Sequence, residues 1–306
     1  MPQAREVKSR IDNIKDIKQI TKAMNAIAMA KVTRLKKKLN KAKPYRQAAE
    51  SKLKLFTQNG LPRDSKGEEK LSPLLTEGDG ESVGLVVFNS DRGLAGNYTV
   101  DLNRAARDFI LSREEDLRLY AGGEKGRNFF RKWDELERSW VGFYQEPEFS
   151  HAEAIGKELL EDFLAGKFRE LWVVYMKFHS DLSQELKLEK ILPLSRPDET
   201  EAGKESEVSS KADDATRMEE YLFEPRQEDI VSTYCREWFL GSIFWIILNT
   251  KTSEQAIRRK TMRDATENAD ELIEDLTLTY NKARQQQITR EIADIIGGAE
   301  ALREES

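Results

Sequence analysis

The chain has 306 residues, of which 34% are charged and 39% are hydrophobic, and its formal net charge is -5. The hydrophobic fraction is low for a compact globule, so we expect much of the chain to be helical with water on most sides. Its single cysteine excludes an intrachain disulfide, and its most hydrophobic run, residues 238–248, has about half the length that a membrane-spanning helix needs.

The N-terminal segment is predicted to be one long helix over residues 1–56. Residues 3–43 contain neither Gly nor Pro, the residues that most often end a helix. Apolar side chains recur there mostly three or four residues apart, which is the spacing of one helix face. The predicted stripe consists of Val7, Ile11, Ile14, Ile17, Ile20, Met24, Ile27, Leu35 and Leu39.

The same segment is strongly basic. Residues 1–50 hold 14 Lys or Arg and four acidic residues, and residues 31–43, with the sequence KVTRLKKKLNKAK, form the densest part. One interpretation is a solvated helix face, and the other is a docking strip for an acidic partner, either phosphate or carboxylate. Only Tyr45 lies nearby as an aromatic residue, which weakens a single-stranded nucleic-acid interpretation.

The middle of the chain alternates between strand and helix patterns after an expected surface loop at residues 57–82. The strand candidates are Val83–Phe88 and residues 117–120, 140–144 and 171–178, and the helical patterns cover residues 102–111, 125–133 and 151–164. This order favours a parallel or mixed sheet with covering helices. We therefore predict a small doubly wound, Rossmann-like α/β domain over residues 83–194.

The glycine turns of this domain do not match nucleotide-binding motifs. The turn at residues 89–99 lacks the G-x-G-x-x-G spacing and the Lys-Ser/Thr pair of a P-loop, and Lys125 is followed by Gly126 and Arg127 rather than by a hydroxyl residue. His151 and His179 have no Cys partners at metal-ligand spacing. We expect no catalytic, cofactor or metal site.

The last third of the chain predicts an exposed acidic loop over residues 195–226 and a second long helix over residues 227–302. Residues 195–229 hold 12 acidic and five basic residues, whereas residues 242–296 contain neither Gly nor Pro and could reach roughly 80 Å as a helix. Gly241 is a possible weak point or kink. The helix again carries an apolar stripe, made of Leu272, Leu276, Tyr280, Ala283, Ile288, Ile292 and Ile295.

Two such stripes at opposite ends of the chain favour a long antiparallel coiled coil that brings the termini together. The alternative is a pair of ordinary helices in a bundle.

Three segments together resemble the gamma subunit of rotary F-type ATP synthases. They are ITKAM at residues 20–24, SDRGLAGN at residues 90–97, and LTLTYNKARQQQITREIADIIGGAEAL at residues 276–302. The resemblance implies a rotor shaft without catalysis of its own. Its paired helices would stand inside a hexamer of alternating alpha and beta subunits, with the α/β domain near the epsilon subunit and the c-ring. Proton or sodium flow would then drive ATP synthesis.

The resemblance also implies a location, partners and contact residues. The chain would be peripheral on the cytoplasmic face of a bacterial inner or thylakoid-type membrane. It would touch that membrane only through the c-ring and bind neither nucleic acid nor a cofactor. The basic strip of residues 31–43 would face acidic loops of the beta subunits. The residues that would contact the surrounding ring are Met24, Lys31, Arg34, Lys36, Lys37, Lys38, Arg258, Arg284, Gln285, Thr289 and Glu291.

This sequence departs from the family pattern in three places. Ala95 stands where the family often has Cys, and Arg259 and Lys260 stand in a stretch that is usually more apolar. The acidic loop is lengthened but has no cysteine pair, which excludes thiol switching through it. Two other classes stay open: a nucleotide-using α/β enzyme with helical extensions, and a basic coiled-coil adaptor for nucleic acid.

Overall fold

The computed structural model describes residues 2–58, 72–143, 146–194 and 226–304. The predicted acidic loop lies outside the described residues, apart from Arg226. The chain divides into two compact units. The helical unit combines Met1–Ala30 with Arg258–Ser306, and the α/β unit comprises Lys31–Ile257. Each unit is described by itself below.

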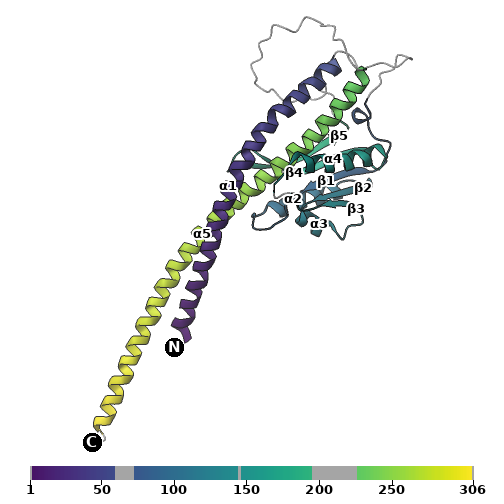
Figure 1. Cartoon of the computed structure of the whole chain (residues 1–306). Helices are drawn as coiled ribbons and strands as arrows, with labels where there is room; N and C mark the ends of the chain where they lie inside the picture. Colours follow the sequence, from purple (N-terminus) through teal and green to yellow (C-terminus); the bar gives the residue numbers. More distant parts are fainter. Residues whose placement is uncertain (1, 59–71, 144–145, 195–225, 305–306) are drawn as a thin grey trace. The chain divides into compact units, whose positions relative to one another are not determined.

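Two long helices contribute to both units. Helix α1 covers Pro2–Gln58 and helix α5 covers Gln227–Glu304 (Figure 1). Helix α5 is continuous through Gly241, the predicted weak point or kink. A Cβ at Gly241 would lie 3.2 Å from the Tyr45 ring, so the glycine allows α1 and α5 to approach closely within the α/β unit.

The α/β unit is built on a five-stranded sheet with the order β3-β2-β1-β4-β5. The first four strands run parallel, and β5 is antiparallel to β4. The strands are β1 Val83–Phe88, β2 Leu117–Gly122, β3 Leu136–Trp140, β4 Glu170–Phe178 and β5 Gln184–Leu192. The short helices are α2 Tyr98–Leu111, α3 Glu124–Phe130 and α4 Phe149–Leu164, and a 3-10 turn covers Pro73–Leu75.

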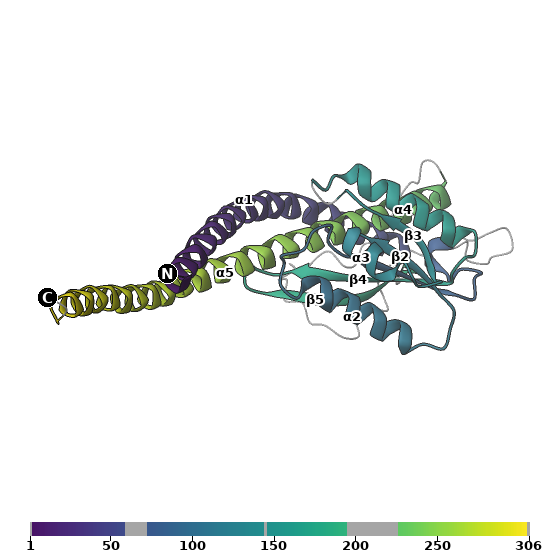
Figure 2. The same ribbon diagram turned by 90° about the horizontal axis from the view of Figure 1, so that it is seen from below.

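Alternation along the strands divides the core into two layers. Val86, Phe88 and Tyr120 belong to the cluster that includes α4 and the first part of α5. Leu85 and Leu119, which point the other way, belong to the cluster of α2 and α3. Figure 2 shows α2 and α4 on opposite sides of the strands. The sheet is therefore covered on both faces, as its mainly apolar strands require.

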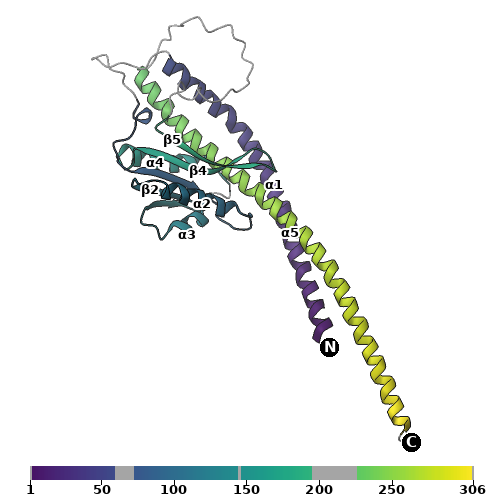
Figure 3. The same ribbon diagram turned by 180° about the vertical axis from the view of Figure 1, so that it is seen from behind.

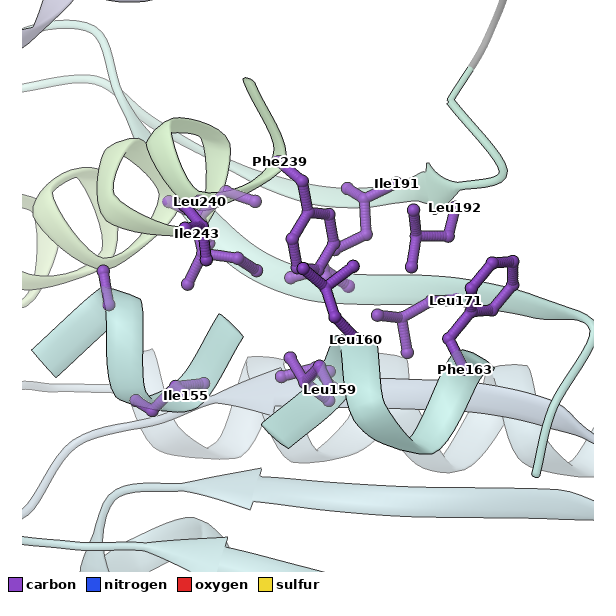
Figure 4. Packing of buried hydrophobic residues seen from close by; sticks show 14 of the residues in the cluster. Ile155, Leu159, Leu160, Phe163, Leu171, Ile191, Leu192, Phe239, Leu240 and Ile243 are labelled. Atoms are coloured by element: carbon purple, nitrogen blue, oxygen red, sulfur yellow. The ribbon is translucent and has the colours of Figure 1, made fainter. Parts of the chain in front are cut away.

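Helix α5 is part of the core of the α/β unit. Figure 4 shows Phe239, Leu240 and Ile243 of α5 packed among residues of α4, β4 and β5. On another side of α5, Leu248 packs with Leu35 and Leu39 of α1, and Figure 3 shows these two helices side by side there. The α/β unit thus holds both long helices through buried apolar contacts.

The predicted fold class is confirmed, with long terminal helices and a central, mainly parallel sheet. Two strand positions differ from the prediction. A strand was expected at residues 140–144, but the observed strand β3 covers Leu136–Trp140. Strand β5 was not predicted. The half-buried β3, LERSW, and the edge strand β5, QELKLEKIL, are rich in charged residues, so neither carries the apolar run by which the other strands were found.

Candidate partner-contact surfaces

The helical unit is an antiparallel helix pair with a narrow, partly polar seam. The Thr266 hydroxyl donates a hydrogen bond to the Thr21 hydroxyl at 2.8 Å, and Lys18 forms an ion pair with Asp270. The earlier residue of α1, Lys18, contacts the later residue of α5, Asp270, so the two helices run antiparallel. Ala28 is only 1% exposed, so small side chains allow the two helices to approach closely.

These pairs also set the register. In an antiparallel pair, the residue numbers of facing residues have a nearly constant sum, which is 287 for Thr21 with Thr266 and 288 for Lys18 with Asp270. By the same sum, Pro2 lies opposite residue 285 or 286. The remainder of α5, to Glu304, therefore extends beyond the start of α1. Part of the predicted apolar stripe of α5 therefore has no counterpart on α1. Ile288, Ile292 and Ile295 lie beyond the start of α1 and are exposed, and Leu272 of the same stripe is exposed although α1 lies opposite it.

A second exposed apolar stripe runs along α1 in the same unit. Ile17, Ile20 and Ile27 are each more than half exposed, although they were predicted in the buried stripe. The buried face instead follows Ile11, Thr21 and Ala28. A seam of two helices covers only a narrow face of each, so apolar residues to the side of it stay uncovered. Exposed apolar stripes of this kind mark interaction surfaces.

The predicted contact residues of the helical unit occupy different environments. Met24 is half-buried and Arg258 is buried. Arg284, Gln285, Thr289 and Glu291 are exposed and lie within about two turns of α5. Two of them have partners on their own helix, because Thr289 donates to the Gln285 carbonyl at 3.0 Å and Glu291 accepts from Gln287 at 2.9 Å.

The basic segment has a role that neither interpretation of the sequence included. Arg34 contacts Glu146 at 2.9 Å, and the Lys38 ammonium donates to the Pro147 carbonyl at 3.0 Å. Lys36 forms an ion pair with Asp181 at 2.5 Å. These three side chains therefore attach α1 to loops of the α/β unit.

The Lys36 ammonium also lies 5.3 Å from the centroid of the Phe178 ring, at the end of β4. Lys37 is exposed and Lys31 is half-buried, and neither forms an ion pair with a described residue. Of the five residues of this segment that were predicted to contact a partner, Lys31 and Lys37 are therefore the two that do not attach α1 to these loops.

The turn after β1 is braced by its own polar groups. Asn89 donates to the Asn103 side chain at 2.8 Å, and the Ser90 and Thr99 hydroxyls lie 3.1 Å apart. Asp91 accepts from the backbone N–H of Glu124 at 3.1 Å, which connects this turn to the start of α3. These groups hold the carboxyl ends of β1 and β2 together.

A buried charged cluster holds α4 to β2 and β3. The Asp162 carboxylate is 3% exposed, accepts a hydrogen bond from the Tyr120 hydroxyl at 2.9 Å, and contacts Arg138 at 3.2 Å and Lys167 at 3.0 Å. Burial alone would raise the pKa of Asp162, but the bonds from Lys167 and Tyr120 and the charge of Arg138 together lower it. The cluster is satisfied by its own members, which indicates a structural role.

The sequence analysis missed one polar segment entirely. Residues 249–255 of α5, NTKTSEQ, are consecutive, all polar, and each at most 5% exposed. A run of seven polar residues directly after the apolar run at residues 238–248 was the available signal. Since a solvated polar run is far more common, the pattern alone did not predict burial.

Two other kinds of feature are absent from the described residues. No group of three or more His, Cys, Asp or Glu side chains in that part of the chain could hold a metal ion. Over the same residues, no helix is long and apolar enough to cross a membrane.

Comparison with known proteins identifies the family. The ATP synthase family model matches residues 3–302. The ATP synthase gamma chain of Desulfitobacterium hafniense is 34% identical over 303 residues, covering 99% of this chain and 100% of the relative. That of Staphylococcus carnosus is also 34% identical, over 306 residues, with the same coverage.

A solved structure of similar fold is a chain of the mitochondrial ATP synthase of Euglena gracilis. It covers 98% of this chain and 94% of its own length, with a TM-score of 0.63 and 16% identity. Together with the sequence matches over nearly the whole length, the antiparallel helix pair and the α/β unit lead to one conclusion: the chain belongs to the ATP synthase gamma-chain family.

Proposed function

We propose that this chain is the central shaft of a rotary ATP synthase and carries torque between a membrane c-ring and a catalytic hexamer of alpha and beta subunits. The observation that supports this most strongly is the family match over residues 3–302 together with an exposed apolar surface on the helical unit. Nucleotide chemistry belongs to the beta subunits, and the shaft itself is not catalytic.

The helical unit is the part that enters the hexamer. Ile288, Ile292 and Ile295 of α5 face outward, as do Ile17 and Ile20 of α1. An apolar surface bears against surrounding subunits without fixed hydrogen bonds, so the shaft can turn while contact is kept. The polar residues Arg284, Gln285, Thr289 and Glu291 then meet one beta subunit after another.

An asymmetric shaft explains how rotation drives chemistry. At any moment the three beta subunits face different sides of the helix pair, so each is biased toward a different conformation and nucleotide affinity. When the shaft turns, each beta subunit faces a new side of the helix pair and adopts the conformation that its neighbour had before. The α/β unit contacts the epsilon subunit and the c-ring on the cytoplasmic face of the membrane. The coupled ion is a proton or sodium.

Reconstitution tests this proposal. Vesicles are prepared with the complete complex, and with a complex assembled without this chain. An imposed ion gradient should drive ATP synthesis only in the first. A sodium ionophore and a protonophore, added separately, identify the ion by which of them abolishes synthesis. Equal synthesis with and without the chain would contradict the proposal.

A further inference from the structure

Strand β4 extends past its neighbour β1 in the α/β unit. The last residue pair between β1 and β4 is Val87 with Val174, whereas β4 continues to Phe178. Backbone groups of alternate residues point to the same side of a strand, so Met176 and Phe178 direct theirs toward the space beyond the end of β1. Backbone groups that are withdrawn from water need partners, and in the described part of the chain no strand pairs with β4 on that side beyond Val174.

Helix α5 supplies those partners with side chains. The Asn249 side-chain oxygen accepts a hydrogen bond from the Phe178 N–H at 3.1 Å. One turn later, the Ser253 hydroxyl donates to the Met176 carbonyl at 3.2 Å. Residues four apart lie about 40° apart around a helix, so these two side chains face β4 together. Two polar side chains thus take the place of a missing strand.

A third bond holds the same part of α5 from another element. The Tyr98 hydroxyl, at the start of α2, donates to the Thr250 carbonyl at 3.3 Å. Residues 249–255 are all buried, and consecutive helix residues point in every direction, so α5 is enclosed on all sides here. The polar anchor, defined as Asn249, Thr250 and Ser253, therefore lies where the α/β unit surrounds the helix.

We propose that the polar anchor is the joint that fixes α5 against turning and sliding within the α/β unit, so that torque applied to this unit passes into the helix. This inference rests on the proposed shaft function. Apolar packing is not directional and tolerates small rotations of a helix, whereas hydrogen bonds to fixed backbone atoms do not. Burying polar groups contributes little net stability, and their use here provides a single register.

Angular fluctuation of a label measures the stiffness of this joint. Lys132, exposed on the α/β unit, is replaced by Cys to carry a bead, while the hexamer is immobilised and stalled without ATP. Cys235 does not compete for the label, because it is buried and burial raises its pKa to about 11. A stiff joint gives a narrow distribution of bead angles.

The test variant combines Asn249→Leu with Ser253→Ala, and the matched control is Thr252→Val. Thr252 is equally buried, but its hydroxyl donates to the Leu248 carbonyl within α5 itself, at 2.6 Å. We expect the double variant to widen the angular distribution and to lower the number of ions pumped per ATP hydrolysed, with hydrolysis retained. The control should match the unsubstituted chain. Loss of general stability would instead lower pumping and hydrolysis together.

Two results would overturn the inference: an unchanged distribution in the double variant, or equal widening in the control. If the double variant does not assemble, Ser253→Ala alone is read by the same criteria. The unsubstituted chain separates this inference from the proposed function. A label that never turns during ATP hydrolysis contradicts the shaft itself, whereas a turning label with unchanged stiffness in the variant contradicts only the anchor.

Discussion

At the scale of single residues, the charged side chains of the α/β unit mostly serve the chain's own fold. Asp162 is the most buried of them in the cluster that joins α4 to the sheet, and Lys36 attaches α1 to Asp181. Sequence reasoning could locate the charges but not their partners, because the partner of Lys36 lies 145 positions away. Such pairings follow from the tertiary fold and not from local spacing.

The Asp162 cluster predicts an acid-sensitive fold. Because the pKa of Asp162 is lowered in the folded chain, its contribution to stability is present above the unfolded pKa of about 4 and lost as pH falls through the folded value. Asp162→Asn should lower the free energy of unfolding at neutral pH by about 1–3 kcal/mol and flatten its decline in acid. Urea titrations at several pH values measure both effects.

Asp108→Asn is the matched control for that experiment. Asp108 forms an exposed pair with Arg107 on α2, and we expect its replacement to change the free energy of unfolding by less than about 0.5 kcal/mol. An Asp162 variant as stable as this control at neutral pH would show that the cluster contributes nothing.

Adjacent lysines of the basic segment should separate attachment from partner contact. Lys36→Gln removes the ion pair with Asp181 and the contact with Phe178, and it should lower the free energy of unfolding by up to about 1 kcal/mol. Lys37→Gln should leave stability unchanged and slow ion-driven ATP synthesis at low salt, if Lys37 meets an acidic partner. Equal stability of both variants would refute the attachment role.

At the scale of elements, the sequence predicted best where a pattern has a single physical cause. Long stretches without Gly or Pro correctly indicated α1 and α5, although α1 continues through Pro44 and α5 through Gly241. Apolar runs indicated β1, β2 and β4. The face of α1 that is buried was only partly predicted, because apolar periodicity marks every face that avoids water. Apolar periodicity therefore does not distinguish the face of α1 that packs on α5 at Ala28 from the exposed apolar face at Ile17, Ile20 and Ile27.

The turn between β2 and α3 depends on one glycine. Gly123 has a φ of +85°, and a Cβ there would lie 2.6 Å from the Asn89 carbonyl oxygen. Gly123→Ala should lower the free energy of unfolding by about 1–3 kcal/mol, because both backbone conformation and space exclude a side chain. Gly93→Ala is the control, since its nearest neighbour atom, Lys125 Cε, is 3.9 Å from the Cβ position. Similar unfolding midpoints for the two variants would count against this account of the turn.

The helix pair offers a comparable test in the helical unit. Ala28→Leu inserts three carbon atoms into a seam where Ala28 is almost completely buried, and it should cost about 1–3 kcal/mol through forced displacement of the helices. Ala26→Leu places the same side chain on the exposed side of α1. Circular dichroism during thermal unfolding compares the two. A seam variant as stable as the exposed one would mean that the helices are not closely packed at this point.

At the scale of the whole molecule, the central claim is that this member of the ATP synthase gamma-chain family turns inside its hexamer. The bead on Lys132→Cys tests it when the hexamer is immobilised by its alpha and beta subunits and ATP is supplied. We predict continuous rotation of the bead in one direction, stopping when ATP is removed. A bead that stays at a fixed angle while the same complexes hydrolyse ATP would contradict the account.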